Sequence, residues 1–273
     1  METIELVPGL LHMFRFGVGQ AYLWQDPGSL TLIDAGPPGQ GAAIAQGLED
    51  LGLGLGDVHR LILTHFHGDH AGSAAGVAAW GSATVMAHRA DAPVIRGDTP
   101  GPPPVLTDEE RPLHARIMAA AGASQEADTA DTADTADTAT RRAETDGGAR
   151  SQSASLARVP PCRVDRELAE GDLLDFGGGA AVIGVPGHTD GSIAIHLPAH
   201  RLLFAGDSVA RTQDGRVILG PFNVDRAAAI GAFVKLSDLD VDVACFGHGG
   251  PLLADAAAAM RAVVRQKSFG LAP

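Results

Sequence analysis

Cysteines, aromatic residues and long apolar runs are all scarce in this chain of 273 residues. The two cysteines, Cys162 and Cys245, lie far apart and form no CxxC pair, so we expect no disulfide framework. No apolar run reaches the roughly 18 residues that a membrane span requires. The N-terminal residues 1–8 lack the basic region and apolar core of a signal peptide. These absences predict a protein of the reducing cytoplasm with no membrane partner.

Positive charge is also in short supply. The chain has 20 Lys and Arg residues against 33 Asp and Glu residues, which gives a formal net charge of −13. Such an acidic chain is repelled by nucleic-acid phosphates and by anionic membranes, so we expect neither as a partner. Hydrophobic residues make up 45% of the chain, which is long enough to bury a large core.

Histidine and aspartate, in contrast, are concentrated in one short segment. His65, His67, Asp69 and His70 form the pattern H-x-H-x-D-H directly after the apolar run 61–63, which is typical of a buried strand. Imidazoles and a carboxylate at the end of a strand predict a metal site. The alternative is a polar loop with a few hydrogen-bonded histidines, and the close spacing makes that interpretation much weaker.

The hydrophobic pattern predicts strands and helices in two β-rich halves. The expected strands are 4–7, 10–16, 21–24, 30–33, 61–64, 83–87, 173–176, 180–185, 193–197, 201–205 and 241–246, with a hairpin at 209–219. The expected helices are 41–52, 73–80, 90–95, 107–122, 225–236 and 252–268. On the first of these helices, Ala42, Ala45 and Leu48 form the expected apolar side. This order favours a layered αβ/βα sandwich over a parallel doubly wound sheet.

Residues 97–160 have a different composition and are interpreted as an insertion. The segment begins with the turn-rich run 97–104, and Asp-Thr-Ala repeats four times over 128–139. We expect about 123–157 to be disordered, because this part is polar and poor in helix formers. A metal-binding acidic repeat is the weaker alternative, since the spacing lacks the glycine turn of a calcium loop. Residues 97–122 are expected to form an active-site lid or a dimer contact, and deletion of 124–156 should leave folding intact.

Three further strand ends carry a potential metal ligand in a glycine-rich turn. His188, Asp207 and His248 each follow an apolar run, and glycines beside them allow a sharp turn that could aim the side chain into a common pocket. A single histidine in such a turn is more often an exposed surface residue. Three such turns together with the H-x-H-x-D-H loop indicate one shared metal site.

With these motifs the chain closely resembles the metallo-β-lactamase-fold hydrolase superfamily. The resemblance rests on Asp34-Ala-Gly36, the segment from Thr64 to Ser73, the segment from Pro186 to Ser192, Gly206-Asp207-Ser208 and Gly247-His248-Gly249. It implies a single domain over 1–273, built as a four-layer αββα sandwich (class α+β) with two mixed β-sheets facing each other and helices outside.

The resemblance also implies a ligand set. His65, His67 and His188 would hold one metal, Asp69, His70 and His248 the second, and Asp207 would bridge them. Asp34 would hydrogen-bond to the metal loop, although a turn or helix-cap role remains an alternative for it. Two Zn²⁺ ions per chain are expected, with Fe or Mn as alternatives.

The expected activity is hydrolysis of an ester, thioester or lactone of a small molecule by a hydroxide shared between the two metals. Asp69 could also serve as a proton shuttle for the leaving group. The protein is expected to be a monomer or a homodimer. The alternative is a mononuclear non-haem iron oxidoreductase of the persulfide dioxygenase type, because those enzymes resemble this chain in the same ligand positions.

At several positions this chain differs from the patterns of particular subfamilies, and these differences narrow the choice of subfamily. Lactam-cleaving members typically carry Cys or Ser where this chain has Asp207. Only 25 residues follow His248, too few for the glutathione-binding helical domain usual in glyoxalase II. The quorum-quenching lactonases use a tyrosine near the Asp207 position, whereas the single tyrosine of this chain is Tyr22. The chain therefore resembles a glyoxalase-II-like or lactonase-like bacterial hydrolase of undetermined substrate.

Overall fold

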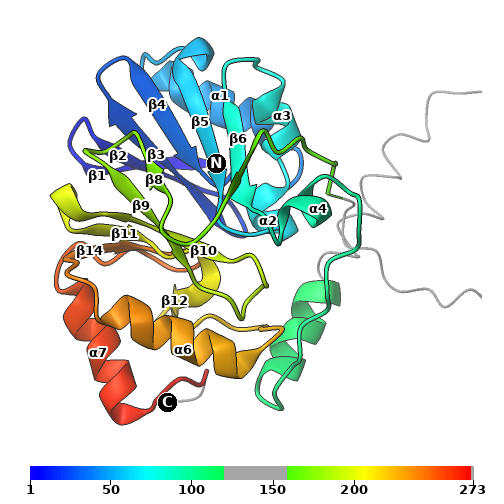
Figure 1. Ribbon diagram of the computed structural model, residues 1–273, viewed down its shortest axis with the longest axis vertical. Coiled ribbons are helices and arrows are strands. Elements are labelled where there is room, and N and C mark those ends of the chain that lie inside the picture. The colour runs from blue at the N-terminus through cyan, green and yellow to red at the C-terminus, as the bar shows by residue number, and fades with distance from the viewer. Residues whose placement is uncertain (120–158, 272–273) are drawn as a thin grey trace, which may run out of the picture.

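Two mixed β-sheets form the middle of the molecule in the computed structural model, which describes residues 1–119 and 159–271 (Figure 1). The first sheet has seven strands in chain order: β1 (Glu2–Val7), β2 (Leu11–Arg15), β3 (Gln20–Asp26), β4 (Ser29–Ile33), β5 (Val58–Leu63), β6 (Thr84–His88) and β7 (Arg166–Leu168). Its pairs are antiparallel from β1 to β4 and parallel from β4 to β7.

The second sheet has five strands in the order β14-β11-β10-β9-β8. They are β8 (Leu173–Leu174), β9 (Ala180–Gly184), β10 (Ile193–Leu197), β11 (Leu202–Phe204) and β14 (Val243–Cys245). Only the β11–β14 pair is parallel. The expected hairpin is present as a separate pair, β12 (Val209–Arg211) and β13 (Val217–Leu219). The structure therefore confirms the expected sandwich of two mixed sheets.

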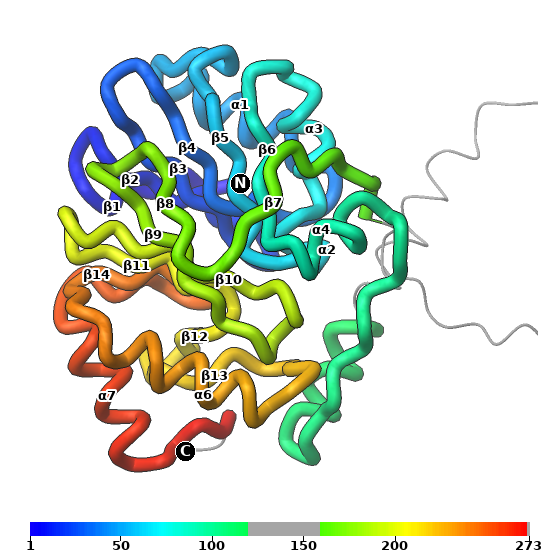
Figure 2. Tube along the Cα trace, in the orientation of Figure 1, coloured from blue at the N-terminus to red at the C-terminus, as the bar shows by residue number. Residues whose placement is uncertain are grey.

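Helices cover the outer faces of both sheets (Figures 1 and 2). In the first half they are α1 (Gly41–Asp50), α2 (Gly68–Ala71), α3 (Ala74–Ala78) and α4 (Ala92–Ile95), and in the second half α6 (Arg226–Ser237) and α7 (Ala256–Gln266). Short 3₁₀ turns are formed by Leu55–Asp57, Pro198–His200 and Gly206–Ser208. In the described part of the chain, no helix is both long enough and apolar enough to cross a membrane.

Strand β3 illustrates why the layers form. Successive side chains of a strand point to opposite faces. Leu23 belongs to the same apolar cluster as Ile44 of α1, on the outer face of the first sheet, while Trp24 and Phe204 belong to the cluster between the two sheets. A third apolar cluster, which includes Phe233 of α6, fills the space between the second sheet and its helices. Trp24 is completely buried.

The boundary between the two halves differs from the expectation. Strand β7 follows the insertion in sequence, yet it pairs in parallel with β6 and completes the first sheet. It has only three residues, of which only Leu168 is buried, so it carries no clear alternating pattern. The buried face of α1 also differs: it consists of Ile44, Gly47 and Leu48, whereas Ala42 is exposed.

The insertion is described only in part. Residues 97–107 have no helix or strand, as expected, and residues 110–119 are helical. The Asp-Thr-Ala repeats and the segment expected to be disordered lie outside the described residues, so both expectations stay predictions.

The buried cysteines lead to a first prediction. Both are free thiols, and burial raises the pKa of Cys162 to about 11 and that of Cys245 further still. The thiolate is the reactive form, so a shift of about two pKa units lowers its fraction at pH 8 by about 100-fold. We expect both thiols to react with Ellman's reagent at least that much more slowly in the native protein than in urea. Rapid labelling of the native protein would contradict this burial.

The topology brings several loops to one edge of the sandwich. Strands β4, β5 and β6 are parallel, so the loops after their carboxyl ends lie at the same edge of the first sheet. In the second sheet β9 and β11 both run antiparallel to β10, and β14 is parallel to β11. The loops after β9, β11 and β14 therefore also share an edge, and these loops carry the remaining predicted ligands.

Candidate metal centre

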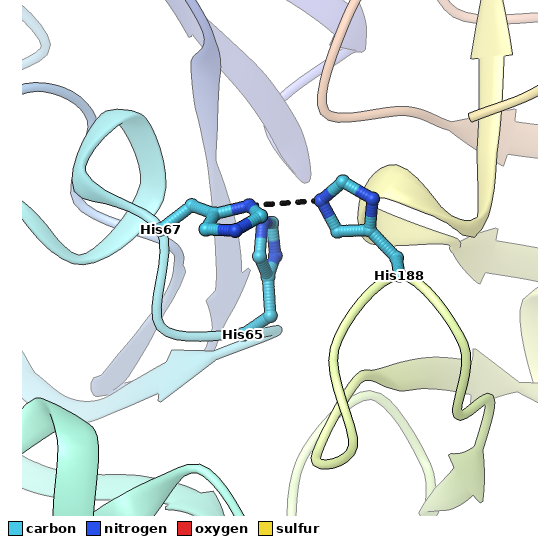
Figure 3. A group of neighbouring side chains, drawn as sticks. All are labelled: His65, His67 and His188. Carbon is cyan, nitrogen blue, oxygen red and sulfur yellow. Dashed lines mark hydrogen bonds between the residues drawn. The ribbon is translucent and has the colours of Figure 1, made fainter. Parts of the chain in front are cut away.

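Three histidines from the two sheets converge at this edge (Figure 3). His67 Nδ1 lies 3.1 Å from His65 Nε2 and 2.9 Å from His188 Nε2. His65 and His67 follow β5 of the first sheet, whereas His188 sits in the turn after β9 of the second. One nitrogen from each ring lies within 4.8 Å of the other two, which is a spacing that can hold a metal ion.

A second cluster lies beside the first. It consists of Asp69, His70 and His248, and one ligand atom from each lies within 4.8 Å of the others. Asp69 Oδ2 is 3.0 Å from His248 Nε2 and 3.8 Å from His70 Nε2. Asp69 and His248 are partly exposed, while His70 is fully buried. The cluster therefore opens to solvent on the side of Asp69 and His248.

Asp207 lies between the two clusters. Its Oδ2 atom is 3.5 Å from His188 Nε2 in the first cluster and 3.2 Å from His248 Nε2 in the second. Its Oδ1 atom is 3.2 Å from His70 Nε2. Gly247 makes this approach possible, because a Cβ atom there would lie only 1.9 Å from Asp207 Oδ1. The seven predicted ligands are thus brought together, in the grouping that the resemblance implies.

The hydrogen bonding of these buried groups is incomplete within the described residues. His70 Nε2 and Asp207 Oδ1 have no hydrogen-bond partner, although they lie close enough for an ion pair. Buried polar atoms without a partner are costly, since they have lost their contacts with water. A cation between these atoms would satisfy both, and five imidazoles with two carboxylates are a donor set that suits Zn²⁺, Fe or Mn. The residues therefore fit a two-metal site.

The protonation of the three-histidine cluster also suits a metal. Burial lowers the pKa of His65 well below its ordinary value, that of His67 to about 3, and that of His188 as well. These imidazoles are therefore neutral at pH 7, the form that offers a lone pair to a metal.

The carboxylates stay ionised. Burial alone would raise the pKa of Asp207, but the charges of His248 and His70 hold it well below its ordinary value. In turn, Asp207 raises the pKa of His248 to about 10 although burial opposes this. In the metal-free protein the negative charge of Asp207 is therefore balanced by protonated His248 and His70. A divalent cation would take the place of these two positive charges.

Asp34 holds the metal loop in place through hydrogen bonds to Thr64 and His70. Its Oδ1 atom accepts a hydrogen bond from the Thr64 backbone N–H (2.7 Å), and Oδ2 accepts from Thr64 Oγ1 and pairs with His70 Nδ1 (2.8 Å each). Asp34 is buried and has a φ of 62°, a left-handed conformation that Asp tolerates better than most residues. The expected contact with the metal loop is therefore present, and its effect on His70 is to fix the orientation of the ring.

Two residues that support the loop of His248 were not singled out in the sequence. Gln20 donates from Nε2 to the backbone carbonyl groups of Phe246 and Gly249, and Tyr22 OH donates to Phe246 O at 2.7 Å. Both lie on β3, so the first sheet holds a ligand loop of the second. No local pattern marks them, because these contacts join residues more than 200 positions apart.

Asp91 is the other supporting residue that sequence patterns did not indicate. It follows β6, is 2% exposed, and contacts the loops of both His67 and His188. Burial raises its pKa to about 6, against hydrogen bonds from Thr189, Gly191 and Phe66 that lower it, so it is ionised at neutral pH. Asp91 follows the carboxyl end of a parallel strand, as His65 and His67 do. This position could have marked it as a residue near the site.

The start of the insertion crosses from the metal loop to the loop before α6. Gly101 packs against the Phe66 ring, since a Cβ atom there would lie 2.4 Å from it, and Val105 N donates to Asn223 O at 2.8 Å. The buried Glu110 carboxylate accepts from the backbone N–H of Thr107 (2.8 Å) and of Phe222 (3.1 Å). Whether this segment acts as a lid stays a prediction.

Glu110 is expected to hold this segment in place. Glu110→Gln leaves only one acceptor oxygen for two backbone donors, so one buried N–H loses its partner at a cost of about 1–3 kcal/mol. We expect faster proteolysis within 97–119 and little change in global unfolding. Glu109→Gln, which alters the exposed neighbour, serves as the control. Equal proteolysis rates for both variants and the wild type would contradict the anchoring role.

Comparison with known proteins agrees with this geometry. The family model of the metallo-beta-lactamase superfamily matches residues 14–248. A hydroxyacylglutathione hydrolase of Cereibacter sphaeroides is 40% identical over 109 residues, which cover 39% of this chain and 40% of that protein. An acyl-coenzyme A thioesterase of Gallus gallus is 44% identical over 61 residues, covering 22% of this chain and 21% of that one. The matches thus span two fifths or less of these relatives.

Solved structures share the fold over nearly the whole chain. A metallo-beta-lactamase family protein of Thermus thermophilus aligns with a TM-score of 0.61 and 24% identity, over 97% of this chain and 81% of that one. The metallo-beta-lactamase BJP-1 of Bradyrhizobium japonicum aligns with a TM-score of 0.64 and 18% identity, over 98% of this chain and 90% of that one. With the family model covering most of its length, this chain belongs to the metallo-beta-lactamase superfamily.

Proposed function

We propose that this protein is a metal-dependent hydrolase that cleaves the thioester bond of a small molecule, with esters and lactones as related substrates. The observation that carries the proposal is the position of Asp207 between two complete clusters of potential ligands. The curated relatives named above support the thioester bond, since they are named a hydroxyacylglutathione hydrolase and an acyl-coenzyme A thioesterase.

His65, His67 and His188 would hold one metal, Asp69, His70 and His248 the other, and Asp207 would contact both. Two bound divalent cations supply Lewis acidity that polarises a carbonyl group and makes water nucleophilic at neutral pH. The chain's own residues set the geometry: neutral imidazoles hold one side, and the ionised Asp207 balances the positive charge. The buried positions of His65, His70 and Asp207 keep bulk water from that side of the site.

Asp69 is the carboxylate placed to move a proton. Its side chain is 26% exposed, compared with 7% for Asp207, so it alone of the two reaches the open side where a leaving group would depart. In our proposal Asp69 takes up the proton that the attacking water gives up, on the carboxylate oxygen that does not hold the metal, and passes it to the sulfur or oxygen of the leaving group. A carboxylate in this position would contribute a factor of about 10²–10⁴ to the rate.

Asp69→Asn tests this role. The amide keeps a ligand oxygen but cannot carry the proton, so we expect kcat to fall by about 10²-fold or more. Metal content must be measured on the same preparation, because loss of the metal would lower kcat for a different reason. Unchanged turnover with both metals retained would eliminate the proton-transfer role.

Metal analysis combined with substrate assays tests the proposal as a whole. Two zinc ions per chain and turnover of hydroxyacylglutathione or acyl-coenzyme A thioesters are the expected results. The alternative, a persulfide dioxygenase, would instead contain one iron and consume oxygen on glutathione persulfide. Because the two activities differ in metal number, metal identity and oxygen use, a single purified sample separates them.

A further inference from the structure

A buried carboxylate outside the seven potential ligands connects the two loops that carry the three-histidine cluster. Asp91 Oδ2 accepts hydrogen bonds from the backbone N–H of Phe66 (3.0 Å) and from Thr189 Oγ1 (2.7 Å). Its other oxygen, Oδ1, accepts from the backbone N–H of Gly191 (2.8 Å). The carboxylate is thus surrounded by donors from two separate segments.

These donors lie immediately beside the histidines. Phe66 stands between His65 and His67 in the loop after β5, while Thr189 and Gly191 follow His188 in the turn after β9. The two loops come from different sheets. A shift of one sheet relative to the other would therefore move His188 away from His65 and His67, unless a bond ties the loops together. Asp91 provides such a bond beside the histidines, in addition to the backbone bond from Ile193 N to Thr64 O.

The turn of His188 is built to receive this carboxylate. Gly191 allows the close approach, since a Cβ atom there would lie 2.4 Å from Asp91 Oδ1. Thr189 is fully buried, and its backbone N–H and hydroxyl both bond to Ser192 Oγ, at 3.0 and 2.8 Å. The hydroxyl that reaches Asp91 is therefore held in one orientation, and it belongs to the residue next to His188.

We infer that Asp91 is a positioning residue that sets the spacing of His65, His67 and His188 and thereby the metal affinity of that cluster alone. The inference rests on the ligand assignment of the proposed function. Asp34 has the corresponding place beside the other cluster, where it pairs with His70. Asp34 also bonds to Thr64, the residue before His65, so an effect on one cluster alone is expected of Asp91 and not of Asp34.

Asp91→Asn weakens the connection with almost no change in volume. The backbone partners of Asp91, Phe66 N–H and Gly191 N–H, are both donors and contact different oxygens. An amide has one oxygen and one NH₂ group, so either orientation places the NH₂ against a backbone N–H. One of these two backbone hydrogen bonds must therefore be lost, which weakens the connection between the loops.

Zinc binding to the metal-free protein, measured by competition with a chromophoric chelator, tests the inference. We expect Asp91→Asn to weaken zinc binding by about 10- to 100-fold in a His248→Ala background, where the three-histidine cluster remains complete. In a His188→Ala background, where the other cluster remains, affinity should change less than twofold. A similar loss in both backgrounds, or no loss in either, would overturn the inference.

Two further sets of variants keep the test decisive if Asp91→Asn folds poorly. Thr189→Val removes the hydroxyl bond at nearly constant shape and should weaken the same cluster, whereas Thr189→Ser should restore wild-type affinity. Asp190→Asn removes an exposed negative charge from the same turn and should have no effect. If Thr189→Val and Thr189→Ser bind zinc alike, the hydroxyl bond to Asp91 has no positioning role. Tight zinc binding without thioester turnover would instead contradict the proposed function and leave this inference standing.

Discussion

Asp207→Asn is expected to lower kcat/KM for a thioester by about 10³-fold, the upper end of the cost of losing one preorganised polar group at an active site. The substitution keeps the shape of the side chain but removes its charge. Asp207 is only 7% exposed, and its carboxylate contacts His70 and His248 at 3.2 Å and His188 at 3.5 Å. Asp207 contacts histidines of both clusters, so both should lose affinity for metal together.

The readouts are metal content after dialysis and thioester turnover at fixed zinc concentration. Asp238→Asn is the matched control, because it makes the same chemical change at an exposed position on the C-terminal side of α6. The control should retain both metals and full turnover. A variant Asp207→Asn that keeps two zinc ions and undiminished turnover would contradict the bridging position assigned to Asp207.

Asp34→Ala is expected to have the largest effect on stability. It removes three hydrogen bonds and leaves the Thr64 backbone N–H and His70 Nδ1 buried without their partner. Each unsatisfied buried group costs about 1–3 kcal/mol, so the free energy of unfolding should fall by about 3–5 kcal/mol. Metal affinity should fall by about 10- to 100-fold as well, because the His70 ring is no longer oriented.

Urea unfolding of the metal-free protein separates these two effects. Asp34→Gly is a useful companion variant, because glycine adopts the left-handed backbone of residue 34 without strain. Alanine there should be less stable than glycine by about 1 kcal/mol, and the remaining loss in both variants reports the missing hydrogen bonds. If Asp34→Ala unfolds at the same urea concentration as the wild type, Asp34 would have to be regarded as an ordinary turn residue.

Much of the fold could be predicted from local patterns. The strands of the first sheet from β2 to β6 are mostly buried and rich in apolar residues, so their positions were recognisable. Strand β7 was missed because it has three residues and only one buried side chain. Its place in the first sheet depends on pairing with β6 across the insertion, a contact of which the sequence carries no local trace.

In the candidate site, too, some residues could be recognised from local patterns and others could not. The H-x-H-x-D-H loop and the three glycine-rich turns were visible because each combines a ligand side chain with a sharp turn after an apolar strand. Gln20 and Tyr22 carry no such signature, and Asp91 has only its place after a parallel strand. Their roles arise from hydrogen bonds to loops of the other sheet, about 100 to more than 200 residues away.

The amino-acid sequence by itself determined the chemistry available to this protein: five imidazoles and two carboxylates, in loops and turns that follow apolar strands. The resemblance already implied the place of Asp207 and the contact of Asp34 with the metal loop. Only the tertiary structure decided that Gln20, Tyr22 and Asp91 bond to loops of the other sheet. The physical reason is that side-chain types and turns are local properties of the chain. Distances of 3 Å between loops from two sheets are set by how those sheets pack against each other.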